Sequence, residues 1–260
     1  MKNVLFLALL TVLLFSACGR IPSLAEPTST PLPSDTPQPT ATRTPTSTPT
    51  STPTATPNAT ATAAAVATQV ADEVLSDLDK ILGDTDIPYR QGHLAWQQND
   101  PLSIHMAGPD QEVLEIDDEL TAGDFILKSD ITWEATGLLL CGAIFRSEPN
   151  LLEGKQYQFL FLRFSGLPAW AIEVHEFGQF QNSPTKTKFS DALDLANGAT
   201  NQVLLVVQDD HFTLYLNDAR QGTYYDYSKQ RAEGSFGFIG LQQSGDGLCR
   251  FENSWVWSLD

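Results

Sequence analysis

Residues 137–164 read GLLLCGAIFRSEPNLLEGKQYQFLFLRF, and they carry the clearest indication of the fold. Two runs rich in Leu, Ile and Phe flank the turn-forming segment SEPN, and each run has the length of a strand and is too short for a typical helix. The pattern predicts two buried β-strands joined by a loop. A second apolar pair, VLLVVQDDHFTLYLND at 203–218, turns tightly at Asp209 and Asp210 and predicts a hairpin of the same kind.

From Asp84 onward, short apolar runs alternate with clusters of Gly, Pro, Asn and Asp, and no run of helical period interrupts them. Many short strands with regular turns favour stacked antiparallel sheets over a parallel sheet with crossover helices. We therefore predict an all-β fold, a single antiparallel, jelly-roll-like β-sandwich over residues 84–260. The expected strands are 93–97, 102–106, 112–116, 124–134, 138–146, 156–164, 169–177, 186–190, 202–208, 211–217, 235–242 and 248–257.

The charge of the chain limits its partners. The 260 residues carry a formal net charge of −17 at pH 7. Binding to nucleic acid depends on Lys and Arg that neutralise phosphates, and an acidic surface repels polyphosphates. We therefore exclude nucleic acid and anionic lipid surfaces as partners.

The first residues have the pattern of a secretory signal, residues 1–17, in which Lys2 precedes the apolar run VLFLALLTVLLF. This run is too short to be read as a membrane span. It ends in FSAC, which resembles a bacterial lipobox, where the cysteine is acylated and becomes the mature N-terminus. The resemblance implies lipidation of Cys18 and a lipid anchor on the extracytoplasmic face of the cell membrane. The alternative is an ordinary secreted protein with a free Cys18.

Between the signal and the sandwich, the composition changes twice. Residues 18–60 are near-repeats of Thr, Pro and Ser, which predict a disordered, extended stalk because almost no side chain there can enter a core. Residues 61–83 are Ala-rich and predict one short helix with an apolar stripe. The stripe consists of Val66, Val70, Val74, Leu78 and Ile81. The segment is short for a coiled coil, so we favour a helix that either packs on the sandwich or stays free. An oligomerising coiled coil remains the alternative.

The two remaining cysteines, Cys141 and Cys249, form an even pair once Cys18 is assigned to the lipobox. Disulfides form and persist outside the cytosol, so we predict a Cys141–Cys249 disulfide. Two buried free thiols are the alternative. No Cys/His spacing in the sequence is typical of a metal site, and we predict none.

Five segments carry a family resemblance: CGAIFRSEPN, YQFLFLRFSG, ATNQVLLVVQDDHFTLYLNDAR, GSFGFIGL and CRFENSWVW. In this order they resemble the concanavalin A-like lectin/glucanase sandwich, and more closely the laminin G-like and 3-keto-disaccharide-hydrolase-like domains of bacterial lipoproteins. Asp218 departs from the Asn-Gly turn of that pattern. The resemblance implies the fold and little about function, because the same sandwich hosts many activities.

One acidic segment allows an enzymatic alternative. Glu115, Asp117 and Glu119 resemble the E-I-D-x-E strand of family-16 glycoside hydrolases, in which alternate carboxylates face one cleft. Here Asp118 takes a position that must be apolar, and LTAGDF follows at once, which favours a solvated acidic turn. Glycoside cleavage of the family-16 or 3-keto-disaccharide type stays the alternative function.

The same acidic character bears on cofactors. Asp209, Asp210, Asp246 and the cluster at 117–119 offer the oxygen ligands that calcium prefers. Acidic turns are common in an acidic protein, so we expect no cofactor and keep calcium as the alternative.

Aromatic residues are the strongest functional clue. Trp170 follows SGLP, and Tyr224, Tyr225 and Tyr227 cluster in the polar stretch GTYYDYS. Sugar rings stack on Trp and Tyr while polar groups at a rim supply hydrogen bonds. The polar candidates are Arg163, His175, Gln179 and Asn182. We therefore hypothesise non-catalytic binding of a glycan or cell-surface polymer. Packing of these aromatic rings in the core is the competing interpretation, and a protein–protein adhesion module is a further alternative function.

Overall fold

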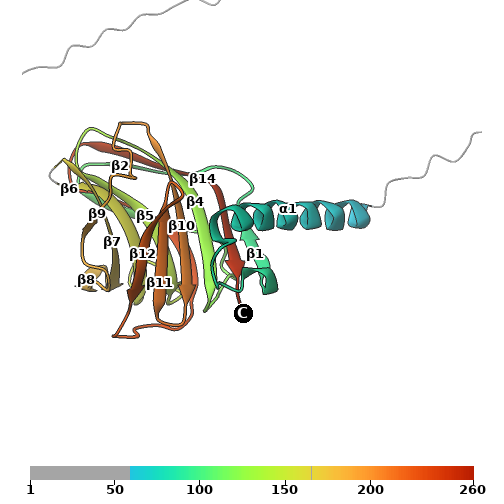
Figure 1. Ribbon diagram of the computed structural model, residues 1–260. Coiled ribbons are helices and arrows are strands. Elements are labelled where there is room, and N and C mark those ends of the chain that lie inside the picture. Colours follow the sequence, from blue (N-terminus) through green and yellow to red (C-terminus); the bar gives the residue numbers. More distant parts are fainter. Residues whose placement is uncertain (1–58, 165) are drawn as a thin grey trace, which may run out of the picture. The chain divides into compact units, whose positions relative to one another are not determined.

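The computed structural model describes residues 59–164 and 166–260, and this part of the chain contains two antiparallel β-sheets of seven strands each, which confirms the predicted sandwich (Figure 1). The predicted signal segment, Cys18 and the stalk up to residue 58 lie outside the described residues. Residues 59 and 60, which were expected to end the stalk, belong to the first turn of the helix α1 (Ala59–Leu82) instead. Among the described residues, no helix is both long enough and apolar enough to cross a membrane.

Sheet A has the strand order β1-β14-β4-β10-β11-β12, with β2 paired to β14. Its strands are β1 (His93–Gln97), β2 (Leu102–Ala107), β4 (Phe125–Ala135), β10 (Thr200–Gln208), β11 (His211–Leu216), β12 (Ala219–Tyr225) and β14 (Asp246–Ser258). Sheet B has the order β3-β13-β5-β6-β7-β8, with β9 paired to β7. Its strands are β3 (Asp110–Glu115), β5 (Leu139–Ser147), β6 (Gln156–Phe164), β7 (Leu167–Glu176), β8 (Gln179–Asn182), β9 (Lys188–Phe189) and β13 (Ser235–Gln242).

Aromatic side chains from both sheets fill the space between them. Phe125 of sheet A lies edge-on to Phe145 and Phe236 of sheet B, with ring centroids 5.8 and 4.7 Å apart. Phe238 of sheet B stacks on Phe251 of sheet A at 4.2 Å. All five side chains are fully buried, and each such burial stabilises the fold by roughly 1.5–3 kcal/mol.

The described residues contain one α-helix, α1 (Ala59–Leu82), which covers part of the outer face of sheet A. Val74, Leu78 and Leu82 of α1 are buried in a second apolar cluster that includes Trp255 and Trp257 of β14. Figure 1 shows the C-terminal turns of α1 beside β1 and β14. The interpretation of this segment as a helix packed on the sandwich is therefore confirmed for its C-terminal half, where Val74, Leu78 and Ile81 of the predicted stripe make the contact, whereas Val66 is 55% exposed.

A short 3-10 helix, η1 (Tyr89–Gln91), connects α1 to sheet A. Trp257 Nε1 donates a hydrogen bond to Tyr89 O at 2.8 Å, and the Tyr89 hydroxyl donates to Asp79 of α1 at 2.7 Å. Lys128 of β4 forms an ion pair with Asp77 of α1 at 3.4 Å. These hydrogen bonds and this ion pair hold α1 against sheet A, next to its apolar contact with β14.

The β11–β12 turn shows how the chain accommodates Asp218. Asn217 and Asp218 have φ values of 47° and 65°, so both central residues of this two-residue turn are left-handed. Asn and Asp tolerate this conformation better than other residues with side chains. The Asn217 amide also donates hydrogen bonds to Ala192 O at 2.6 Å and to Asn201 Oδ1 at 3.0 Å. These bonds hold the turn without a glycine.

Candidate functional site

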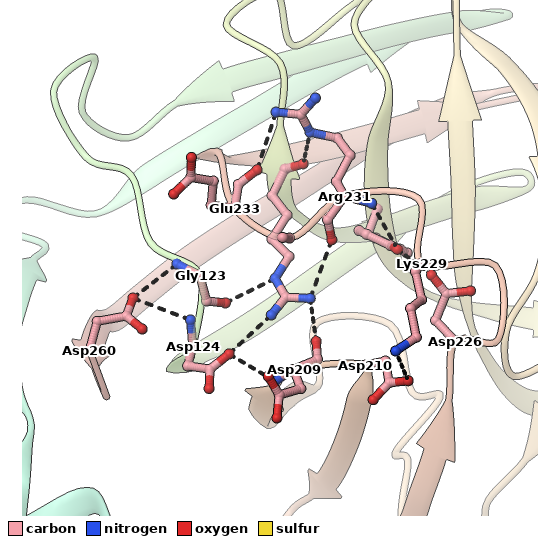
Figure 2. Close-up of a pocket in the computed structure, with 12 residues that line it drawn as sticks. Gly123, Asp124, Asp209, Asp210, Asp226, Lys229, Arg231, Glu233 and Asp260 are labelled. Atoms are coloured by element: carbon pink, nitrogen blue, oxygen red, sulfur yellow. Dashed lines mark hydrogen bonds and ion pairs between the residues drawn. The ribbon is translucent and has the colours of Figure 1, made fainter.

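A cleft of about 640 Å³ opens where several strand ends meet (Figure 2). It is formed by the segment before β4, the end of β5, the start of β6, the β10–β11 turn, the loop between β12 and β13, and the C-terminal residue. Its lining residues are Gly123, Asp124, Arg146, Tyr157, Asp209, Asp210, Asp226, Lys229, Arg231, Ala232, Glu233 and Asp260. We call it the Arg146 cleft.

The strand register explains why these segments converge. In sheet A, Phe125 at the start of β4 pairs with Ser258 near the end of β14 and with Val207 near the end of β10. In sheet B, Phe145 near the end of β5 pairs with Tyr157 near the start of β6. Residues just beyond these positions therefore gather at one end of the sandwich, although they are far apart in the sequence.

Arg146 is the central residue of the cleft. Its side chain is only 3% exposed, and its φ of 47° places it in the left-handed region at the end of β5. Its guanidinium donates hydrogen bonds to Gly123 O at 2.9 Å, to Asp209 O at 2.6 Å and to Arg231 O at 3.4 Å. Arg146 also pairs with the Asp124 carboxylate at 3.2 Å. Four of its five N–H donors are thus used within the protein.

Electrostatics around Arg146 reflect this burial. Burial lowers the pKa of the guanidinium, and the carboxylate of Asp124 opposes the shift. An arginine remains protonated at any physiological pH. The cleft therefore contains a permanent buried cation whose charge is compensated by surrounding carbonyls and by Asp124.

The loop between β12 and β13 forms one wall of the cleft and is anchored by Arg231. Arg231 Nε donates to the backbone carbonyl of Arg146 at 2.8 Å, and its Nη2 donates to Glu233 O at 3.2 Å. Its Nη1 forms an ion pair with Glu148 at 3.2 Å. The second arginine of the cleft is therefore also engaged by groups of the protein.

Tyr157 and Asp226 fix the other part of this loop. The Tyr157 hydroxyl donates a hydrogen bond to Asp226 and accepts one from the Gln230 N–H at 3.0 Å. Burial, followed by the bond to Asp226, raises the pKa of Tyr157, so the phenol stays neutral. Burial acts to raise the pKa of Asp226, but hydrogen bonds from Ser228, Tyr157 and Gln230 lower it overall. Asp226 is therefore an ionised, buried anchor of the loop.

Two exposed tyrosines lie on either side of Asp226 in the chain. Tyr225 is 45% exposed and Tyr227 is 89% exposed, and their rings stack with centroids 5.6 Å apart. His211 packs on Tyr225 at 3.9 Å and contacts Asp210, a cleft residue, at 3.3 Å. We call Tyr225, Tyr227 and His211 the aromatic rim, because they place flat aromatic surface beside the cleft.

Trp170 is a correction to the expected binding residues. Its indole is 1% exposed and belongs to the main core, because β7 directs Trp170, Ile172 and Val174 between the sheets. Tyr224 is half-buried, lies edge-on to Trp170 at 5.3 Å and donates its hydroxyl hydrogen to Gln221 O at 3.0 Å. These two rings form a pair in and beside the core and do not reach the cleft.

The four polar candidates do not form one site. Arg163 pairs with Pro168 and His175 with Gln156, so β6 and β7 hold Arg163 and His175 at opposite ends of their ladder. His175 is buried beside Glu173, with Nε2 and Oε2 2.9 Å apart.

The other two polar candidates lie on β8. Gln179 is exposed at the start of this strand. Asn182 lies at its end, and its amide contacts the Ser228 hydroxyl at 3.5 Å. Asn182 therefore contacts the loop that forms the cleft wall.

The acidic trio lies at the end of β3. Glu115 is exposed at the last position of this strand, and Asp117 and Glu119 follow in a turn in which Asp117 Oδ1 accepts the Glu119 N–H at 2.9 Å. The three carboxylates therefore do not project from one strand, as the glycosidase pattern requires. The acidic turn that we expected from the sequence is present at Asp117 to Glu119.

The residues proposed for calcium also do not converge. Asp209 and Asp210 lie at the Arg146 cleft, whereas Asp246 begins β14, whose register places it near Ala135 at the far end of β4. Among the described residues, no group of three or more His, Cys, Asp or Glu side chains is arranged to hold a metal ion.

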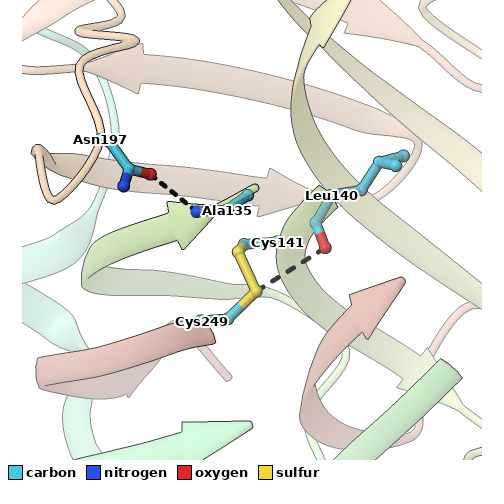
Figure 3. Close-up of a disulfide and its surroundings, with 5 residues drawn as sticks. All are labelled: Ala135, Leu140, Cys141, Asn197 and Cys249. Atoms are coloured by element: carbon cyan, nitrogen blue, oxygen red, sulfur yellow. Dashed lines mark hydrogen bonds between the residues drawn. A yellow bond between two sulfur atoms is a disulfide. The ribbon is translucent and has the colours of Figure 1, made fainter. Parts of the chain in front are cut away.

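The predicted disulfide is confirmed (Figure 3). Cys141 of β5 and Cys249 of β14 are bonded, with Cα atoms 5.7 Å apart, and both are fully buried. The bond joins sheet B to sheet A near the end of β4, where Asn197 accepts the Ala135 N–H at 2.7 Å. It therefore crosslinks the two layers away from the cleft.

The sequence interpretation missed the residues that build the cleft, above all Arg146, Asp124 and Arg231. One signal was present in the sequence, because Arg146 follows directly on the apolar run LLLCGAIF. A charged side chain at the end of a buried strand needs partners, which the sequence alone does not identify.

Comparison with known proteins gives structural similarity only. No family model matches the chain, and no curated protein matches it. A carbohydrate-binding module CBM66 from Bacillus subtilis is similar at a TM-score of 0.47 and 18% identity, covering 59% of this chain and 86% of the module. A β-glucanase from Bacillus licheniformis is similar at 0.43 and 10%, covering 62% and 79%. Sheep galectin-11 is similar at 0.35 and 8%, covering 55% and 98%. Similarities at this level assign no activity to the chain.

Proposed function

We propose that this protein is a non-catalytic glycan-binding domain, held on the extracytoplasmic face of the cell membrane by a lipid on Cys18. The glycan or cell-surface polymer enters the Arg146 cleft and stacks on the aromatic rim. The observation that supports this most is the combination of a 640 Å³ polar cleft with two stacked tyrosines, one of them 89% exposed, beside it.

The chemistry of the cleft suits a sugar. Sugar rings present apolar faces that pack on Tyr rings, and their hydroxyls need several acceptors and donors at fixed positions. The cleft supplies carboxylate acceptors from Asp124, Asp209 and Asp260, and Arg146 and Arg231 hold the walls in place. Because the site is already ordered, binding of a ligand does not incur the entropic cost of ordering its side chains.

A glycan array with the purified domain tests the binding proposal. Tyr225→Ala combined with Tyr227→Ala should weaken binding of any recognised glycan about 10- to 100-fold, the equivalent of roughly 1.4–2.8 kcal/mol for two stacking rings. Phe189→Ala is the matched control, because Phe189 is a 55% exposed aromatic on β9, outside the cleft lining and the aromatic rim. Absence of glycan binding, or equal loss in the control, contradicts the proposal.

Two further assays separate the alternative functions. Release of reducing sugar from a bound glycan, abolished by Glu115→Gln, would establish a glycoside hydrolase instead. Binding to a cell-surface protein with no response to any glycan would establish an adhesion module.

The membrane anchor has its own test. Labelling of cells with a radioactive fatty acid should mark the wild-type chain and leave Cys18→Ser unlabelled. A wild-type chain that carries no label contradicts the anchor and leaves the glycan proposal intact.

A further inference from the structure

The charges of the Arg146 cleft are unequal. Six of its lining residues are carboxylates, Asp124, Asp209, Asp210, Asp226, Glu233 and Asp260, and three are cations, Arg146, Lys229 and Arg231. The formal charge of the lining is therefore −3, derived from these six and three residues. A ligand in the cleft is surrounded by a surplus of negative charge.

Each of the three cations is already paired. Arg146 pairs with Asp124 at 3.2 Å, and Lys229 pairs with Asp210 at 3.1 Å. Arg231 pairs with Glu148, outside the lining, at 3.2 Å. A sulfated, phosphorylated or uronic sugar would need at least one free cation, because Lys and Arg are the groups that recognise such anions.

Four carboxylates of the lining form no ion pair with any described residue: those of Asp209, Asp226, Glu233 and Asp260. Asp226 is buried and accepts hydrogen bonds from Tyr157, Ser228 and Gln230, so it is not open to a ligand. Asp209 and Glu233 are exposed at the cleft, and their backbone carbonyls, not their carboxylates, accept the bonds from the arginines. Asp260 differs, because one carboxylate oxygen accepts the Gly123 N–H at 3.1 Å. Asp209 and Glu233 are therefore the two carboxylates most available to a ligand.

The aromatic rim also attracts positively charged groups. The faces of Tyr225 and Tyr227 carry partial negative charge, which favours a cation placed against them. Tyr227 is 89% exposed, so its ring is open to a ligand. The cleft and its rim thus both favour a positively charged sugar over a neutral one and exclude an anionic one.

We propose that the Arg146 cleft selects amino sugars with a protonated amine, such as glucosamine oligomers, over their N-acetylated and acidic counterparts. This inference rests on the proposed function, since it names the class of sugar that the same cleft takes. The amine would lie near the carboxylates of Asp209 and Glu233, with a sugar ring against the aromatic rim.

Calorimetry with short oligomers tests the proposal. Glucosamine trimers and tetramers should bind about tenfold tighter than the matched N-acetylglucosamine oligomers at low salt, and about 0.5 M NaCl should reduce the preference to roughly twofold. Raising the pH from about 6 to about 9 should also remove the preference, because the amine loses its proton while carboxylates stay ionised.

Variants assign the preference to the cleft. Asp209→Asn with Glu233→Gln should abolish the preference for the amine and retain binding of the neutral oligomer. Glu112→Gln, an equal change of charge at an exposed site on β3, should leave the preference unchanged. Trilysine, which carries charge without a sugar ring, should bind at least tenfold more weakly than the glucosamine trimer.

The outcomes distinguish the two proposals. Equal or tighter binding of the N-acetylated or an acidic oligomer, lost with the tyrosine variants, overturns the amine preference and leaves glycan binding in place. Equal binding of trilysine, or equal loss of preference in Glu112→Gln, reduces the effect to the net charge of the protein and also overturns it. Failure of every sugar to bind overturns the proposed function itself.

Discussion

Replacing Arg146 by Met tests whether this residue organises the cleft. The substitution keeps an unbranched apolar side chain about as long as the aliphatic part of arginine, and it removes the cation that bonds to Gly123, Asp209 and Asp124. Breaking a buried ion pair by removing one partner costs about 3–5 kcal/mol. The Asp124 side chain is 32% exposed, so water will solvate it in part, and we expect about 3 kcal/mol.

Urea unfolding followed by tryptophan fluorescence measures this loss. With a slope of about 2 kcal/mol/M, the midpoint should fall by roughly 1.5 M. Arg220→Met is the matched control, because Arg220 is exposed on β12 and donates to Thr223 at 2.9 Å, and it should cost less than about 0.5 kcal/mol. A loss below about 1 kcal/mol for Arg146→Met would refute the idea that its bonds hold the cleft together.

Two further predictions concern stability. Because Cys141 and Cys249 are 108 residues apart, replacing both by Ala should lower the free energy of unfolding by about 4–5 kcal/mol in the chain-entropy model, and an unchanged urea midpoint would contradict this. The pKa of Asp226 lies below its usual 3.8, so its carboxylate stabilises the folded state above that pH and ceases to do so as the pH falls through the folded pKa. The stability difference between wild type and Asp226→Asn should therefore shrink from neutral pH toward about pH 2, and urea titrations that show a constant difference would contradict the assignment.

The predicted strands succeeded where both faces of a strand are packed. β6 and β13 occupy the predicted residues 156–164 and 235–242, because central strands consist of apolar side chains that only a buried position accommodates. β12, at 219–225, was not predicted. It is an edge strand that pairs with β11 alone and keeps mostly exposed side chains, so its sequence lacks the apolar alternation.

Trp170 and Tyr227 show the same limit at the level of single residues. Both are aromatic and both were expected to bind a ligand, yet one is 1% and the other 89% exposed. Position along a strand decides the first, because Trp170 follows the inward phase of β7. Tyr227 lies in a loop whose direction depends on the bonds of Asp226, which connect distant segments.

The apolar patterning of the sequence was enough to predict a β-sandwich, and its cysteines were enough to predict the disulfide between Cys141 and Cys249. The strands follow from local apolar patterns. The disulfide follows from the two cysteines that remain once Cys18 is assigned to the lipobox, in a compartment where disulfides persist. The Arg146 cleft, in contrast, could be recognised only from the folded chain. Its bonds join Arg146 to three backbone carbonyls and one carboxylate that are 22 to 85 residues away, and these groups come together only through the register of the strands.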